Sequence, residues 1–168
     1  IEWARDEFDV DADISDDEFA ASVRASLAYE DFVVSERLDA ATMNFLSVAA
    51  AKAEAMPFLG TARAMTGGTG YAGEGDVLTA ALVAALARIT GEATFTEWFC
   101  PDYGRDEILL SHMGECNYAM ARKDRPIRLI AKPFAWGDCR RPAVPDQRQY
   151  VGKSLWLDQV DVDQGTSA

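Results

Sequence analysis

Hydrophobic positions in the first half of the chain recur mostly with the spacing of helices. Ser15-Asp16-Asp17-Glu18 places a glutamate three residues after a serine, which is the pattern of a helix capping box. Apolar residues beyond it continue at helical spacing, and we expect this helix to extend to about Leu38. Residues 1–13 are acidic and show no such period, so the pattern predicts irregular structure there.

Shorter apolar runs follow this first helix. Residues 41–46 (ATMNFL) predict a short buried strand, and the alanine-rich segment 47–55 predicts a second helix. Pro57 and the pair Gly67-Gly68 frame a third helix, because proline favours helix starts and glycine favours helix ends. Tyr71-Ala72 then predicts the end of another short strand.

The clearest element is the run VLTAALVAALARIT over Val77–Thr90, which has almost no polar residue. Asp76 can cap its start and Gly91 can end it. A helix that is apolar on all sides is normally a buried helix, so we expect it to lie inside the protein. A strand, a tight turn and a buried helix in this order favour an α/β layer architecture.

The pattern changes after Gly91. Residues 93–99, 107–113 and 127–130 are short β-type runs separated by proline, glycine and aspartate. We therefore predict an α/β part followed by a distinct β-rich part that starts at residue 93.

Composition narrows the possible partners and the compartment. The net charge of −12 disfavours binding to nucleic acid or to an anionic membrane, and no apolar run reaches the length of a membrane span. The three cysteines form no Cys-x-x-Cys pair, so neither a zinc ribbon nor a disulfide framework is indicated, and a reducing cytoplasm fits best. Because the chain starts at Ile1 rather than at methionine and ends in the sequence GTSA, we expect it to be a piece of a longer protein or an engineered chain.

Two polar residues stand out as candidates for chemistry. Glu74 lies between two glycines where a strand should meet a helix, which is where α/β sheets bind ligands; the alternative is a solvated turn carboxylate. His112 is the one histidine of the chain and lies in an apolar run. It can be a ligand, or a core histidine whose polar atoms are satisfied internally.

Glu97 is the third candidate, with aromatic residues on both sides. Strand alternation places Phe95, Glu97 and Phe99 on one face, which favours an inward carboxylate. A buried carboxylate needs a counter-charge or a metal ion, although an outward Glu97 would need neither. Two carboxylates and an imidazole suit a divalent ion such as Mn²⁺, but their spacing is not a compact motif.

Four blocks of sequence, in this order and spacing, resemble the L-arabinose isomerase family. They are Gly70–Asp76 (GYAGEGD), Thr79–Val83 (TAALV), Thr96-Glu97 and Leu109–Cys116 (LLSHMGEC). The resemblance implies that residues 1–92 are part of a central, doubly wound α/β domain. It also implies that residues 93–168 are the start of a C-terminal, barrel-like β domain.

The resemblance also implies a site. Glu74 and Glu97 match the two metal-binding and catalytic glutamates of the family. His112 matches the first of the family's two metal-binding histidines. Phe45 resembles an aromatic residue of the family's sugar pocket. The metal would be Mn²⁺, or another divalent ion such as Co²⁺. The second histidine is absent, because the chain has no other.

The implied activity is the interconversion of an aldose and a ketose, typically L-arabinose and L-ribulose. The ion would stabilise an enediol-like intermediate while the glutamates move a proton between two carbons. The implied partners are a small sugar and further copies of the chain, since the family builds its sites between subunits; a lone piece would then be inactive. The segment Trp98–Tyr103 departs from the family pattern, so the sugar can differ.

Two other functions stay open from the sequence. One is a non-catalytic module that binds a sugar or a metal ion and retains the isomerase fold, which the missing second histidine favours. The other is a structural oligomerisation segment whose carboxylates are simply solvated.

Overall fold

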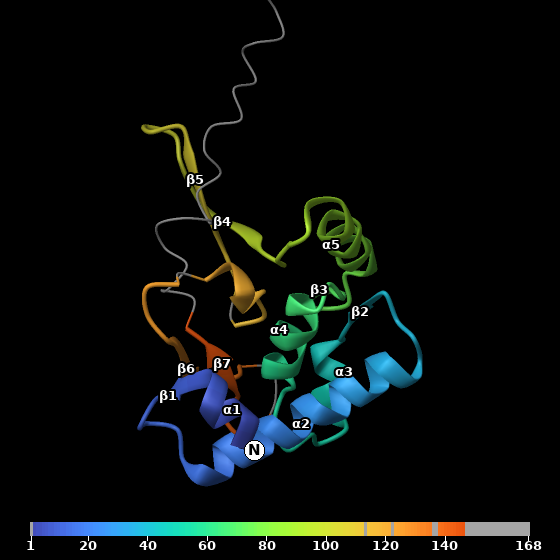
Figure 1. Ribbon diagram of the computed structural model, residues 1–168, viewed down its shortest axis with the longest axis vertical. Coiled ribbons are helices and arrows are strands. Elements are labelled where there is room, and N and C mark those ends of the chain that lie inside the picture. The colour runs from blue at the N-terminus through green and yellow to red at the C-terminus, as the bar shows by residue number, and fades with distance from the viewer. Residues whose placement is uncertain (1, 113, 122, 136–137, 147–168) are drawn as a thin grey trace, which may run out of the picture.

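The chain forms an α/β fold in which helices pack around small sheets (Figure 1). The computed structural model describes residues 2–112, 114–121, 123–135 and 138–146. Within these ranges the strands form one three-stranded sheet and two two-stranded sheets. The predicted α/β class is confirmed, whereas the doubly wound arrangement stays a prediction because each described sheet is small.

The capping-box prediction at the first long helix is confirmed. Helix α2 (Asp16–Ser35) begins where the Glu18 backbone N–H donates to Ser15 Oγ at 3.3 Å and the Ser15 backbone N–H donates to Glu18 Oε2 at 3.0 Å. The irregular structure expected before it is wrong, because α1 (Glu2–Glu7) and β1 (Phe8–Val10) occupy that segment. Their buried apolar side chains join the core, a contribution that the surrounding acidic residues obscure in the sequence.

The predicted strand over 41–46 is too long. β2 spans only Ala40–Thr42, and α3 (Phe45–Ala50) begins inside the predicted strand. The reason is local, since Asn44 Oδ1 accepts the backbone N–H of Leu46 at 3.0 Å and so starts a helical turn. The helix predicted over 47–55 consequently starts earlier and is shorter than expected.

The third predicted helix and the strand after it are confirmed. α4 (Phe58–Thr66) follows Pro57 and ends at Gly67. β3 (Gly70–Ala72) then pairs in parallel with β2, so the carboxyl ends of both strands meet at one edge.

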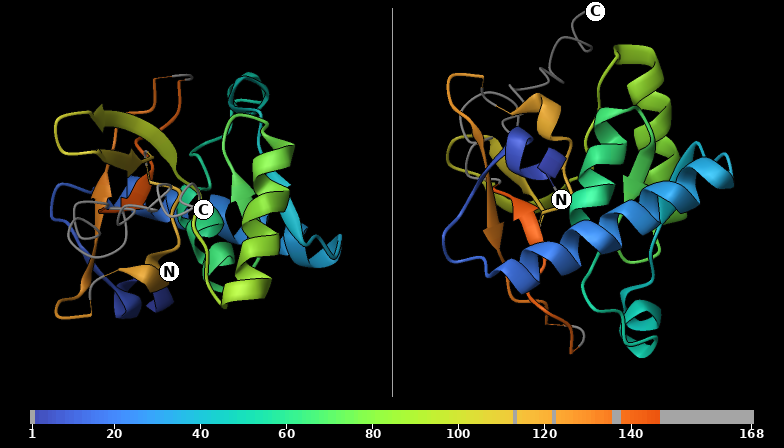
Figure 2. Two further views of the ribbon diagram at one scale, coloured as in Figure 1. Left: turned by 90° about the horizontal axis from the view of Figure 1, so that it is seen from above. Right: turned by 60° about the horizontal axis from the view of Figure 1, so that its bottom comes forward.

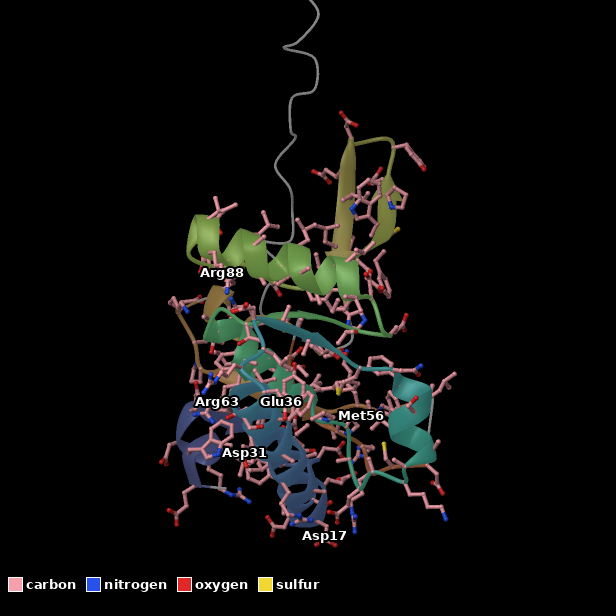
Figure 3. The ribbon with its side chains drawn as sticks, turned by 90° about the vertical axis from the view of Figure 1, so that its right-hand side faces the viewer. Asp17, Asp31, Glu36, Met56, Arg63 and Arg88 are labelled. Atoms are coloured by element: carbon pink, nitrogen blue, oxygen red, sulfur yellow. The ribbon has the colours of Figure 1, made fainter. Side chains whose placement is uncertain are left out.

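Helix α5 (Val77–Thr90) has the predicted bounds, with the Thr79 backbone N–H donating to Asp76 Oδ1 at 2.9 Å. Figure 2 shows α4 and α5 on opposite sides of the β2–β3 pair, and α2 beneath them. The expectation that α5 is buried all round is wrong, because Leu78 is 84% exposed and Ile89 is 80% exposed. Only its alanine-rich face packs on the strands, and Figure 3 shows other side chains projecting from the body of the molecule.

The remaining strands form two sheets. β6 (Ile127–Ala131) pairs in parallel with β1 and antiparallel with β7 (Ala143–Pro145). β4 (Glu97–Asp102) and β5 (Glu107–Ser111) form an antiparallel hairpin that projects from the molecule (Figure 1). No strands within the described ranges close into a barrel, so the barrel-like part stays a prediction.

The predicted boundary between residues 92 and 93 stays a prediction as well. The sheet β1–β6–β7 combines strands from both sides of it, and a short 3-10 helix, η1 (Tyr118–Met120), packs on α4. None of the helices that the structure describes is long and apolar enough to cross a membrane.

Candidate functional site

The turn after β3 holds Glu74 in an unusual backbone conformation. Glu74 has a φ of 60° and Gly75 a φ of 88°, both in the left-handed region. Thr42, at the end of β2, fixes this turn, because its Oγ1 accepts the Gly75 backbone N–H at 3.1 Å and donates to the Gly73 carbonyl at 3.4 Å. A glutamate held at positive φ by the neighbouring strand is a feature that functional sites often show.

An open pocket of about 320 Å³ lies beside this turn. Among the described residues, Asn44, Phe45, Leu46 and Glu74 line it, so the aromatic candidate and the first carboxylate candidate share one cavity. The ring of Phe45 is buried and packs edge-on against Phe58.

Gly73 brings the pocket close to the histidine. A Cβ at this position would lie 3.2 Å from Phe45 Cζ and 3.4 Å from both His112 Cε1 and Phe95 Cε1. The absence of a side chain therefore lets these three rings approach the strand end together.

His112 lies immediately after β5, with only 8% of its side chain exposed. Its Nδ1 is 2.8 Å from Glu115 Oε2, and its Nε2 is 3.8 Å from Glu97 Oε2. The ring also stacks in a tilted arrangement on Phe95, with centroids 4.5 Å apart. The structure thus brings Glu97 and His112 together, as the candidate site requires.

Glu115 is a site residue that the sequence reasoning missed. It is fully buried, and Tyr71 donates a hydrogen bond from its hydroxyl to Glu115 Oε1 at 3.2 Å. The available signal was a carboxylate three residues after the histidine in an apolar segment, since such a group must find partners inside the protein.

The electrostatics of the cluster favour a protonated imidazole. Burial lowers the pKa of His112, but Glu115, Glu97 and Glu74 raise it by more, so the net shift is upward from 6.5. Burial, with the nearby Glu115 charge, also keeps the pKa of Tyr71 well above its usual range, so its hydroxyl remains a donor. The site therefore concentrates negative charge around one imidazole.

The expected inward position of Glu97 is wrong. All residues of β4 are exposed, and 45% of the Glu97 side chain is accessible. A register shift between Trp98 and Cys100 breaks the alternation, so Phe95 is buried while Phe99 is 65% exposed. Glu97 therefore faces solvent on one side and His112 on the other.

The types of donor atom at this site fit a divalent metal ion, but the distances between the donors do not. Carboxylate oxygens and an imidazole nitrogen suit ions such as Mn²⁺. Within the described part of the chain, however, no group of three or more candidate ligands is close enough to hold a metal. Glu97 and His112 form a pair, and the metal site stays a prediction.

Glu74 follows the parallel strand β3 and lines an open pocket, and Glu97 and His112 face each other from the antiparallel β4–β5 hairpin, all within an α/β fold. The family model of the L-arabinose isomerase central domain matches residues 4–92. The chain therefore belongs to the L-arabinose isomerase family, which relates it to the sugar isomerases. A search of curated proteins found no match.

Proposed function

We propose that this chain acts, as part of a longer polypeptide, in an isomerase that interconverts an aldose and a ketose sugar. The observation that carries the proposal is the pairing of His112 Nε2 with Glu97 Oε2 at 3.8 Å, next to the pocket that Glu74 lines. The matching family model describes one domain of such an enzyme, which supports a role within a larger protein.

Each residue then has a role that its position allows. Glu74 and Glu97 are accessible carboxylates whose charges both act on the histidine, and they act as the general base and general acid that move a proton between adjacent sugar carbons. Phe45 forms an apolar wall of the pocket, against which the carbon face of a sugar can pack. Asn44 adds a polar side chain at the same wall for a sugar hydroxyl.

We propose Glu74, Glu97 and His112 as the residues of this chain that hold Mn²⁺ or Co²⁺. When bound, the ion would polarise the sugar oxygens and stabilise the charge of the enediol. Because only two of these donors are paired in the structure, we expect weak binding that further ligands outside this chain strengthen.

The partners follow from the same proposal. The substrate is a small sugar, and further copies of the chain complete the site between subunits in the cytoplasm. Nucleic acids and membranes are not proposed, because a net charge of −12 repels phosphate groups.

Activity of the protein from the complete reading frame tests the proposal. With Mn²⁺ and L-arabinose, we expect L-ribulose from the wild type and a loss of at least about 100-fold in Glu97→Gln, as for removal of a general acid–base group. Glu92→Gln is the matched control, because Glu92 is an exposed carboxylate close to Glu97 in sequence. Full activity of Glu97→Gln would refute the catalytic role of this carboxylate.

A non-catalytic sugar- or metal-binding module is the second candidate. The observation that favours it is the lack of a three-ligand group among the described residues. It predicts sugar or Mn²⁺ binding to the complete protein without turnover of L-arabinose or of related aldoses.

A further inference from the structure

The buried end of the candidate site contains a chain of three polar side chains. The Tyr71 hydroxyl donates to Glu115 Oε1 at 3.2 Å, and Glu115 Oε2 lies 2.8 Å from His112 Nδ1. Glu115 is fully buried, and only 8% of the His112 side chain is exposed. One oxygen of the buried carboxylate therefore accepts a hydrogen bond, and the other lies in close contact with the imidazole.

This arrangement determines which imidazole nitrogen carries the proton. A carboxylate only accepts hydrogen bonds, so at a separation of 2.8 Å it repels a lone pair on Nδ1 and favours a proton there. When the ring is neutral, the proton then lies on Nδ1 and leaves a lone pair on Nε2, the atom that faces Glu97.

The neighbours of the ring keep it in this orientation. Phe95 packs on it with ring centroids 4.5 Å apart, and the ring lies close to Gly73, where a Cβ would be 3.4 Å from His112 Cε1. A flip of the ring would place a carbon against the buried carboxylate and leave that carboxylate without its partner.

We propose that Glu115, held by Tyr71, is a positioning residue that fixes His112 in the Nδ1–H tautomer and presents Nε2 to Glu97. The inference deepens the proposed function and rests on it only for the role of Nε2 as a ligand or proton acceptor. A purely structural Glu115 would stabilise the fold without selecting a tautomer, because an apolar side chain of similar volume can fill such a space equally well.

Nitrogen NMR of the imidazole tests this directly. The 168-residue chain has one histidine, so the ring signals of ¹⁵N-labelled protein need no assignment by mutation. At alkaline pH, where the ring is neutral, we expect Nδ1 to show the shift of a protonated nitrogen and Nε2 that of an unprotonated one. A proton on Nε2, or on both nitrogens at every pH at which the protein is folded, would overturn the proposal without any variant.

Two nearly isosteric variants separate positioning from packing. Glu115→Gln removes the charge next to Nδ1, and the two nitrogen shifts should move toward each other as the tautomers mix. Tyr71→Phe is the matched control, because it removes a hydroxyl from the same network but leaves the carboxylate at Nδ1, so the tautomer should persist. An unchanged tautomer in folded Glu115→Gln would show that Glu115 does not select it.

Addition of Mn²⁺ alone distinguishes failure of this inference from failure of the proposed function. Selective broadening of the His112 ring signals, with those of helix α2 left sharp, supports a metal role for Nε2. An Nδ1–H tautomer with no selective broadening would refute that metal role while the positioning by Glu115 stands. An Nε2–H tautomer with broadening would overturn the positioning inference and retain the metal role.

Discussion

Replacing Glu74 with glycine should make the protein more stable while it removes a proposed site residue. Glu74 has a φ of 60° in the turn that Thr42 fixes, and a residue with a Cβ is strained there. The left-handed conformation costs an L-residue about 1–2 kcal/mol, and the greater freedom of glycine in the unfolded chain offsets part of this. We expect Glu74→Gly to raise the free energy of unfolding by about 1 kcal/mol.

Urea denaturation of three variants measures this effect. Glu74→Ala and Glu74→Gln keep the Cβ and should unfold within about 0.5 kcal/mol of the wild type, since Glu74 is exposed. All three variants lack the carboxylate and should lose the proposed isomerase activity of the complete protein equally. If Glu74→Gly were no more stable than Glu74→Ala, the strain in this turn, and the argument that function maintains it, would be wrong.

Three further predictions concern packing and charge. Gly70→Ala should destabilise the protein by about 2–3 kcal/mol in urea denaturation, because its Cβ would lie 2.2 Å from a backbone oxygen of α5; an unchanged midpoint would contradict this packing. The pKa of His112, followed by NMR, should lie above 6.5 and fall in Glu115→Gln. The protonated imidazole stabilises the folded state fully below pH 6.5, and this stabilisation is lost as pH rises through the folded-state pKa. Arg141→Ala should lower the free energy of unfolding at pH 7, since the guanidinium bonds to Glu18. That difference should shrink as pH falls from 4.5 toward the Glu18 pKa of about 2, and a pH-independent difference would refute the ion pair.

Local signals in the sequence predict much of the α/β half. The capping box at Ser15 and the Asp76 and Gly91 signals around α5 each depend on a few neighbouring residues, and each is confirmed. The position of the turn at Glu74 was also predictable, because two glycines and a helix start mark it in the sequence, whereas the contacts of Thr42 that fix its conformation come from the neighbouring strand.

Features that depend on distant contacts are harder to predict. β1 forms only because β6, more than 100 residues later, pairs with it, as Phe8 opposite Ile127 shows. The exposure of α5 also depends on what covers it, which its apolar composition cannot reveal. The hydrogen bond from Tyr71 to Glu115 joins residues that are 44 positions apart, so local sequence signals do not predict it.

Titration of Mn²⁺ into the chain, followed by electron paramagnetic resonance of the free ion, tests the shared site most directly. We predict weak binding that is reduced in each of Glu74→Gln, Glu97→Gln and His112→Gln and is retained in Glu92→Gln. Loss in all three variants would show that these side chains act on one ion despite the open geometry of the described residues. The account would be contradicted if the wild type and all four variants bound Mn²⁺ equally. It would also be contradicted if the chain bound one Mn²⁺ tightly and His112→Gln still bound it.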